Sequence, residues 1–310
     1  MPVDAENGLL RDDLLDTILP LWTEERIAAA YQGWHAAGIR FFRPVTDALL
    51  KAGGVQPGMH VLDVGTGTGI PALVLAEVVG PEGKVVASDP SAPMIAAVAS
   101  NASVAGTTNV ECVRAVVEAL PFPDGTFDVV VSQAGIMFAS DLPRALSEIA
   151  RVTRRGGRVA FSAWGRVDEN PWLTGFWGAV DEFRERLQPS DAVSSSDAPL
   201  PPPDPRNPFR FAEPGSLSDA LRRAGLQDVA EEHLTVWLRA PGRGEALLEF
   251  YLNFSRFEEE IPRDLRSEFR ERVLSNFAAF ADGDEVSLPA RIVIASGNVG
   301  LREGSGDAAE

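Results

Sequence analysis

The segment with the clearest chemical potential is VLDVGTGTG at residues 61–69, in which Gly65, Gly67 and Gly69 directly follow an apolar run. Glycines at alternate positions tolerate positive φ angles and let a ligand approach bare backbone. They open an expected helix, whose free N–H groups favour a negative ligand group. Asp89 ends the next apolar run, 20 residues beyond Gly69, where a carboxylate can reach ribose hydroxyls. This pattern predicts a nucleoside site; a tight strand-to-helix turn with a capping acid is the structural alternative.

Two classes of nucleoside cofactor fit this loop. Residues 67–72 match the loose dinucleotide pattern G-x-G-x-x-A, so NAD is one candidate. However, Asp63 stands two residues before the first glycine and would place a negative charge beside a pyrophosphate. The ammonium group of an amino-acid moiety would tolerate that charge. The glycine run also begins early, at Gly65, and both features favour a sulfonium nucleoside.

The elements that position the loop follow from hydrophobic patterning. Short apolar runs alternate with amphipathic segments, which is typical of a parallel, doubly wound α/β sheet. The expected strands are His60–Val64, Lys84–Asp89, Val110–Val116, Phe127–Gln133, Arg158–Trp164, Val229–Leu238 and Ala290–Ser296. The expected helices are Gly69–Val79, Ala92–Ala105, Asp141–Val152 (with Asp141 as N-cap) and Ser216–Ala224, and residues 8–50 and 245–280 are expected to be largely helical.

Four motifs in order resemble those of class I S-adenosylmethionine-dependent methyltransferases. They are VLDVGTGTG, SDPSAPMIAAV, EALPFPDGTFDVVVSQAGIMF and EIARVTRRGGRVAFSAW. The chain is most similar to the ubiquinone/menaquinone-biosynthesis C-methyltransferase-like branch, strongly over residues 55–165 and weakly over 208–240. The resemblance implies a Rossmann-like α/β fold with a seven-stranded, mostly parallel sheet and helices on both faces. An N-terminal helical lid and an insertion between strands five and six complete the expected architecture.

The resemblance also implies roles for individual residues in binding S-adenosyl-L-methionine and releasing S-adenosyl-L-homocysteine. In the family an Asp commonly bonds the adenine amino group, and here that position is Val116. The implied cofactor contacts are Asp63, Gly65, Thr66, Gly67 and Gly69 at the methionine end, Asp89 at the ribose, Pro90 and Met94 flanking the adenine, Val117 and Glu118 at its edge, and Ser132 near the sulfonium.

Catalysis by such a protein needs few reactive side chains. Methyl transfer from a sulfonium is an in-line displacement, so the protein mainly positions the reactants and excludes water, and supplies a base only if the acceptor must lose a proton. His35 and Tyr31 are the candidate bases, with packing as the alternative for each. Gln133 is a candidate for orienting the acceptor, with a backbone-bonded amide as the alternative. The histidines and the one cysteine have no metal-ligand spacing, so no metal site is expected.

Composition restricts the partners. The chain has 28 Lys and Arg against 45 Asp and Glu, a net charge of −17, which disfavours nucleic acid and anionic membrane surfaces as partners. A single cysteine, an acidic start without a signal-peptide pattern, and no apolar stretch long enough to span a bilayer predict a cytoplasmic protein, monomeric or homodimeric. Aromatic residues Trp172, Phe176 and Trp177 either line a pocket for a planar, hydrophobic acceptor or pack a small cap.

The sequence therefore predicts an enzyme that methylates a small, hydrophobic or aromatic metabolite. The alternatives are a protein that binds S-adenosylmethionine without transferring methyl, an NAD-dependent oxidoreductase, and a protein-modifying or interacting role. The expected divisions are a lid at 1–50, a cofactor-binding core at 51–165, an insertion with a Pro-rich loop at 166–213, completion of the core at 214–300 and a flexible tail at 301–310.

Overall fold

The computed structural model describes residues 25–187, 208–255 and 257–300. The helices expected before residue 25, the Pro-rich loop and the tail at 301–310 lie outside the described residues.

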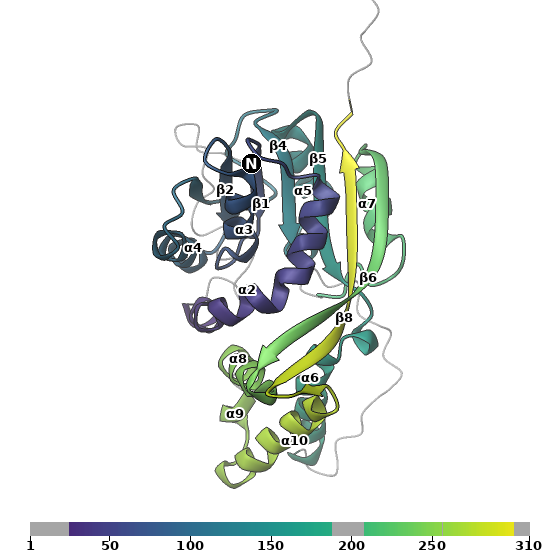
Figure 1. Cartoon of the computed structure of the whole chain (residues 1–310). Coiled ribbons are helices and arrows are strands. Elements are labelled where there is room, and N and C mark those ends of the chain that lie inside the picture. The colour runs from purple at the N-terminus through teal and green to yellow at the C-terminus, as the bar shows by residue number, and fades with distance from the viewer. Residues whose placement is uncertain (1–24, 188–207, 256, 301–310) are drawn as a thin grey trace, which may run out of the picture.

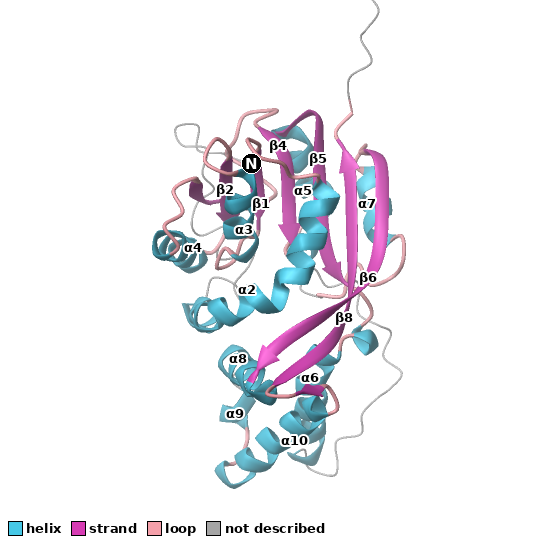
Figure 2. Ribbon diagram, in the orientation of Figure 1, coloured by secondary structure: helices cyan, strands magenta, loops and turns pink. Residues whose placement is uncertain are grey.

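A single twisted sheet forms the centre of the molecule (Figures 1 and 2). Its order is β3-β2-β1-β4-β5-β8-β6; the first five strands are parallel, and β8 runs antiparallel to both β5 and β6. The predicted seven-stranded, mostly parallel sheet is confirmed, with a two-residue strand, β7, added at the edge of β8. The strands are β1 His60–Val64, β2 Lys84–Asp89, β3 Val110–Arg114, β4 Phe127–Gln133, β5 Thr153–Trp164, β6 Gln227–Pro241, β7 Ala281–Asp282 and β8 Glu285–Asn298.

Helices cover both faces of this sheet. Because successive strand residues point to opposite faces, Val129 and Val131 pack in one buried cluster with α3 and α4, while Val130 lies in a second cluster with α5 and α7. The described helices are α2 Glu25–Gly53, α3 Ile70–Val79, α4 Ala92–Val104, α5 Leu142–Val152, α6 Pro171–Leu187, α7 Ser216–Arg223, α8 Glu245–Ser255, α9 Phe257–Glu260 and α10 Arg266–Ala278. As predicted, Asp141 caps α5 by accepting a hydrogen bond from Arg144 N at 3.1 Å.

The last two long strands extend well beyond their predicted ends. Past the pair Trp164–Ile292, β8 leaves β5 and continues with β6 as a two-stranded ribbon, to whose end the short β7 is added (Figure 1). Val236 and Leu238 are buried on one side of the ribbon, whereas Trp237 between them is 55% exposed. This alternation is typical of an antiparallel pair with one solvated face.

The ribbon carries a helical cap built from α6, α8, α9 and α10 (Figure 1). Phe176 of α6 stacks on Tyr251 of α8 with ring centroids 4.6 Å apart, and Trp177 meets the edge of Phe176 at 5.3 Å. Trp172 and Phe176 are buried, so two of the three aromatics expected to line a pocket or pack a cap lie in the cap's interior.

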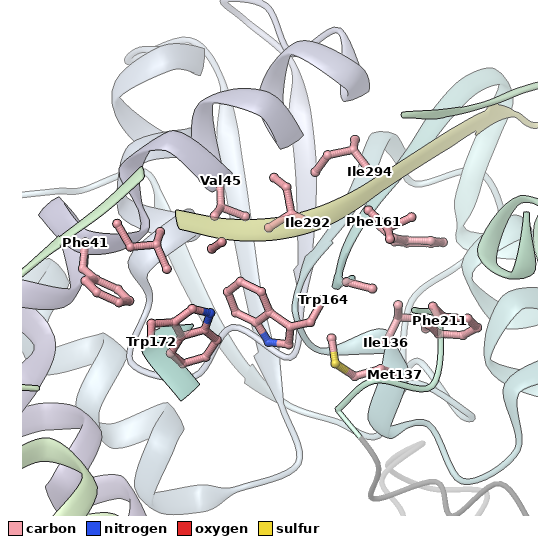
Figure 3. Close-up of a cluster of buried hydrophobic side chains, with 14 of the residues drawn as sticks. Phe41, Val45, Ile136, Met137, Phe161, Trp164, Trp172, Phe211, Ile292 and Ile294 are labelled. Carbon is pink, nitrogen blue, oxygen red and sulfur yellow. The ribbon is translucent and has the colours of Figure 1, made fainter. Parts of the chain in front are cut away.

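Helix α2 connects the core to the cap. Its C-terminal half buries Leu49 and Leu50 against the sheet. In its middle, the ring of Phe41 lies 6.1 Å from that of Trp172 of the cap, measured between centroids. Figure 3 shows Phe41, Trp172 and Trp164 beside Ile292 of β8. Pro44 lies inside this helix, where it removes a backbone hydrogen bond, and α2 is visibly bent (Figure 1).

Asn170 connects the core to the cap where the two meet. It is fully buried; its Oδ1 accepts from Trp172 Nε1 at 3.0 Å and from Arg291 N of β8 at 3.1 Å, while its Nδ2 donates to Arg166 O at 2.7 Å. One side chain therefore fixes the start of α6 against the strand that leads into the ribbon.

Replacing Asn170 tests this joint. Asn170→Ala leaves two buried N–H donors without acceptors and is expected to lower the free energy of unfolding by about 2–4 kcal/mol. Asp168→Ala, in the same turn, removes only an exposed ion pair to Arg166 and should change stability by less than about 0.5 kcal/mol. Urea unfolding followed by tryptophan fluorescence measures both, and equal midpoints for the two variants would contradict this role of Asn170.

Candidate functional site

The glycine loop connects β1 to α3 in left-handed backbone conformations. The φ angles are 69° at Gly65, 56° at Gly67 and 89° at Gly69. A Cβ atom at Gly69 would lie 2.4 Å from Cγ2 of Val98, so this glycine permits α3 to pack against α4. A Cβ at Gly67 would meet nothing within 4 Å, so the backbone at the middle of the loop faces open space that a ligand can approach.

The N–H groups of this loop are already used. Gly65 N and Thr66 N donate to Ser88 O at 2.8 and 3.0 Å, and Gly67 N donates to Asp89 Oδ2 at 3.0 Å. Gly69 N donates to Thr66 O at 2.9 Å. The sequence pattern predicted free donors at the start of the helix that follows, α3, whereas these four groups precede Ile70, its first residue; they bind β2 and the loop itself. A pyrophosphate would find none of them available, which argues against a dinucleotide.

Asp63 places a carboxyl oxygen without a hydrogen-bond donor among the described residues at the base of the loop. Its side chain is fully buried, Oδ2 accepts from Thr66 Oγ1 at 2.6 Å, and Oδ1 has no hydrogen-bond partner among the described residues. Burial, with a smaller contribution from the nearby Asp89 carboxylate, raises the pKa of Asp63 to about 7. A buried carboxylate oxygen without a donor is energetically costly. The ammonium group of an amino-acid moiety fits this site.

Asp89 reinforces the loop from the end of β2. Its Oδ1 accepts from Ser91 N at 2.9 Å and its Oδ2 from Gly67 N. Burial raises the pKa of Asp89 to about 6, although both hydrogen bonds favour the ionised form. Each carboxylate oxygen can accept more than one hydrogen bond, so ribose hydroxyls can be added without breaking the contact to the loop.

A pocket lies where the C-terminal ends of β1 to β4 meet, the usual ligand edge of an open α/β sheet. Glu118 lines it, but the Glu118 carboxylate accepts hydrogen bonds from Ser140 N, Ser140 Oγ and Asp141 N at 2.8 to 3.2 Å. That carboxylate therefore holds the start of α5. The lining residues are Val64, Gly65, Pro90, Ala115, Val116, Val117, Glu118, Gly135, Ile136, Phe138 and Ala139.

Two residues implied as cofactor contacts have structural partners. Met94, 2% exposed, packs with Ile27 and Ala28 beneath the N-terminal half of α2 and does not line this pocket. Ser132 is fully buried and its hydroxyl donates to Val64 O at 2.8 Å, so it ties β4 to the strand that precedes the glycine loop.

The three candidate catalytic residues do not converge. His35 Nδ1 lies 3.0 Å from Thr68 Oγ1 of the glycine loop, whereas Gln133 Oε1 accepts from Thr46 Oγ1 at 2.7 Å. His35 and Thr46 are both on α2, eleven residues and therefore roughly 16 Å apart along the helix. Tyr31 packs edge-on against Phe250 at 5.2 Å, and burial raises the pKa of its phenol, so it stays protonated at neutral pH.

Patterning did not predict the amide contacts that hold α2 over the glycine loop. Gln32 and Asn101 of α4 exchange two hydrogen bonds of 2.7 and 3.0 Å, and Asn101 Nδ2 also donates to Thr68 O at 2.9 Å. With the His35–Thr68 contact, they fix the N-terminal half of α2 to the loop. An Asn buried in an otherwise alanine-rich helix was the only signal in the sequence.

Comparison with known proteins identifies the family. The methyltransferase-domain family model matches residues 62–161. Nocamycin O-methyltransferase of Saccharothrix syringae is 33% identical over 281 residues, which cover 89% of this chain and 96% of that protein. The ubiquinone/menaquinone biosynthesis C-methyltransferase UbiE of Hahella chejuensis is 42% identical over 107 residues, covering 34% of this chain and 43% of its own length.

Solved structures share the fold. The YcgJ protein of Bacillus subtilis aligns with a TM-score of 0.51 at 18% identity, covering 84% of this chain and 99% of its own. Phosphoethanolamine N-methyltransferase 2 of Haemonchus contortus, solved with S-adenosyl-L-methionine, aligns at 0.52 and 18% identity, covering 94% and 60%.

The chain belongs to the class I S-adenosylmethionine-dependent methyltransferases. Within that class it is a methyltransferase of the small-molecule type with UbiE-like relatives, and S-adenosylmethionine is its cofactor. Among the described residues, no helix is both long and apolar enough to cross a membrane.

The buried carboxyl of Asp63 makes stability depend on pH. Its pKa of about 7 in the folded protein exceeds the value of about 4 in an unfolded chain. Between these pH values the folded state keeps a proton that the unfolded state has released, so this group lowers the free energy of unfolding as the pH rises. Asp63→Asn cannot ionise and should gain stability relative to wild type between about pH 5 and pH 8.

Thermal unfolding of both cofactor-free proteins across this range measures the difference. Glu148→Gln is the control, because hydrogen bonds from Arg151 and from Leu120 N lower the pKa of Glu148, so its difference from wild type should not vary above pH 5. A pH-independent difference between wild type and Asp63→Asn would show that Asp63 is already ionised when buried.

Proposed function

We propose that this methyltransferase transfers methyl to an oxygen atom of a small, hydrophobic or aromatic metabolite. The observation that carries the proposal is the extent of the likeness to nocamycin O-methyltransferase, which spans 89% of the chain, against 34% for the C-methyltransferase of Hahella chejuensis. The cofactor core is common to enzymes of many specificities, and the acceptor is selected by what surrounds it. A likeness that extends beyond the core therefore bears on the acceptor.

The described residues offer a consistent cofactor arrangement. The unpartnered Oδ1 of Asp63 would accept from the ammonium group, Asp89 would accept from the ribose, and the pocket between Pro90 and Val117 would hold the adenine. When bound, S-adenosylmethionine supplies an electrophilic methyl group on its sulfonium. Val116 makes the adenine edge of this pocket apolar, so backbone groups there would replace the Asp that is common in the family.

The acceptor would lie over the end of β4, between Gln133 and the aromatic residues that join core and cap. Phe42 is half-buried and lies 6.1 Å from Trp164, and the Gln133 amide is fixed by Thr46 one turn further along α2. These residues orient a planar molecule and exclude water. The N-terminal half of α2 would act as the lid, and release of its contacts to Thr68 would admit the cofactor.

No base is needed if the acceptor oxygen is already acidic. His35 contacts Thr68, and burial lowers the pKa of its imidazole. It also lies far along α2 from Thr46, the residue that binds Gln133. Positioning alone then accounts for the catalysis of an in-line displacement. The single, half-buried Cys112 and the acidic surface are consistent with a cytoplasmic enzyme, monomeric or homodimeric.

The proposal is tested by product analysis. The protein is incubated with S-adenosylmethionine carrying a ¹³C-labelled methyl group and a panel of aromatic and enolic acids, phenols, anilines and electron-rich arenes. We expect methyl ethers or methyl esters, recognised by the ¹³C shift of the labelled carbon, and no transfer to nitrogen or carbon. Label found only on carbon or nitrogen would contradict O-methylation while leaving the enzyme a methyltransferase.

A further inference from the structure

Arg210 lies beside the pocket without a carboxylate partner. It belongs to the turn at residues 208–211 that leads toward α7, and its Nη1 donates to Ala139 O at 2.8 Å. Ala139 and its neighbour Phe138 line the pocket and belong to the turn that follows Gln133 and β4, the strand over whose end the acceptor would lie. Figure 3 shows Phe211, the residue after Arg210, beside Ile136 and Met137 of that turn. The guanidinium also lies over the ring of Phe211, 5.6 Å from the centroid, so two contacts fix its position at the pocket wall.

The charge of Arg210 is not neutralised within the described part of the chain. No carboxylate there forms an ion pair with it, and burial alone lowers its pKa. Arg151, by contrast, pairs with both Glu148 and Asp124. Glu118, the acid in the pocket wall, accepts hydrogen bonds from Ser140 and Asp141 through Oε1 and forms no ion pair with Arg210. A half-buried guanidinium presents five N–H donors, and only one of them has a hydrogen-bond acceptor here.

The net charge of the protein makes a local cation important for binding anionic ligands. With a net charge of −17, the molecule repels anionic small molecules, which enter only where a local positive charge receives them. Carboxylates and other anionic oxygens are the groups that a guanidinium binds best, often through two parallel hydrogen bonds.

We propose that Arg210 binds an anionic oxygen, from a carboxylate or an enolate, on the methyl acceptor. The acceptor is then an acidic aromatic molecule rather than a neutral one. This inference rests on the proposed function and narrows its substrate class. It also agrees with the lack of a base beside Gln133, because an acidic acceptor is ionised at neutral pH without one.

Binding of matched acids and amides to the protein saturated with S-adenosylhomocysteine tests the role of Arg210. The probes are benzoate, 2-naphthoate and anthracene-2-carboxylate, each compared with its carboxamide, which has the same shape and no charge. Calorimetry at pH 7.5 gives the ratio of affinities. For at least one pair, wild type should bind the acid tenfold or more tightly than the amide.

Three variants locate the effect. Arg210→Gln should reduce the acid-to-amide ratio to about one, while its affinity for S-adenosylhomocysteine stays within twofold of wild type. Arg223→Gln makes the same charge change on an exposed residue of α7 and should keep the ratio. Arg210→Lys, which keeps the charge but loses the planar fork, should fall between them.

The proposal is overturned if no pair shows the preference in wild type, or if the preference survives in Arg210→Gln. It is also overturned if Arg210→Gln loses S-adenosylhomocysteine affinity, because Arg210 would then serve the cofactor. Failure of the proposed function is distinguishable, since it appears as methyl transferred to carbon or nitrogen while the preference for acids persists.

Discussion

The carboxylate of Asp63 is the charge around which this site is arranged. It lies one residue before the end of β1 with no exposed surface, and only one of its oxygens has a donor among the described residues, the Thr66 hydroxyl. An ionised group in that position is unfavourable without a cation. The free-energy cost of ionising the buried Asp63 is offset when a zwitterionic cofactor brings an ammonium group to the carboxylate. The loop thus favours an amino-acid moiety over a pyrophosphate, because the N–H groups of Gly65, Thr66 and Gly67, which a pyrophosphate would need as donors, are already bound to β2.

Helix α2 transmits this local arrangement to the rest of the molecule. One end is packed into the core, Thr46 holds the amide of Gln133, and the other end is bonded to the glycine loop through Asn101 and Thr68. The same helix contacts the cap through Phe41 and Trp172. The cofactor loop, the end of β4 and the cap are therefore parts of one packed unit, and in the proposed arrangement the same helix would close over either ligand.

Most of the sheet could be predicted because its parallel strands are short apolar runs between turn residues; β1, β2 and β4 begin and end where patterning placed them. The ribbon of β6 and β8 was underestimated because alternate residues beyond the predicted ends are polar, as at Arg239, Glu285 and Ser287, so the continuous apolar signal stops early. The partners of Glu118 and Ser132 depend on neighbours distant in sequence, which residue type alone does not reveal. The position of Arg210 beside the pocket arises in the same way, from the return of the chain after the cap helix.

Calorimetric titration of the wild-type protein with S-adenosylhomocysteine, near pH 6.5 and in buffers of different ionisation enthalpy, tests the central claim most directly. At that pH the free protein holds Asp63 largely protonated, because its pKa is about 7, and pairing with the cofactor's ammonium group lowers that pKa. The account predicts binding with release of about three-quarters of a proton, which is the share of Asp63 that is protonated at this pH, and no binding of NADH under the same conditions. Binding of S-adenosylhomocysteine without proton release, or binding of NADH in its place, would contradict the assignment of Asp63 as the partner of the cofactor.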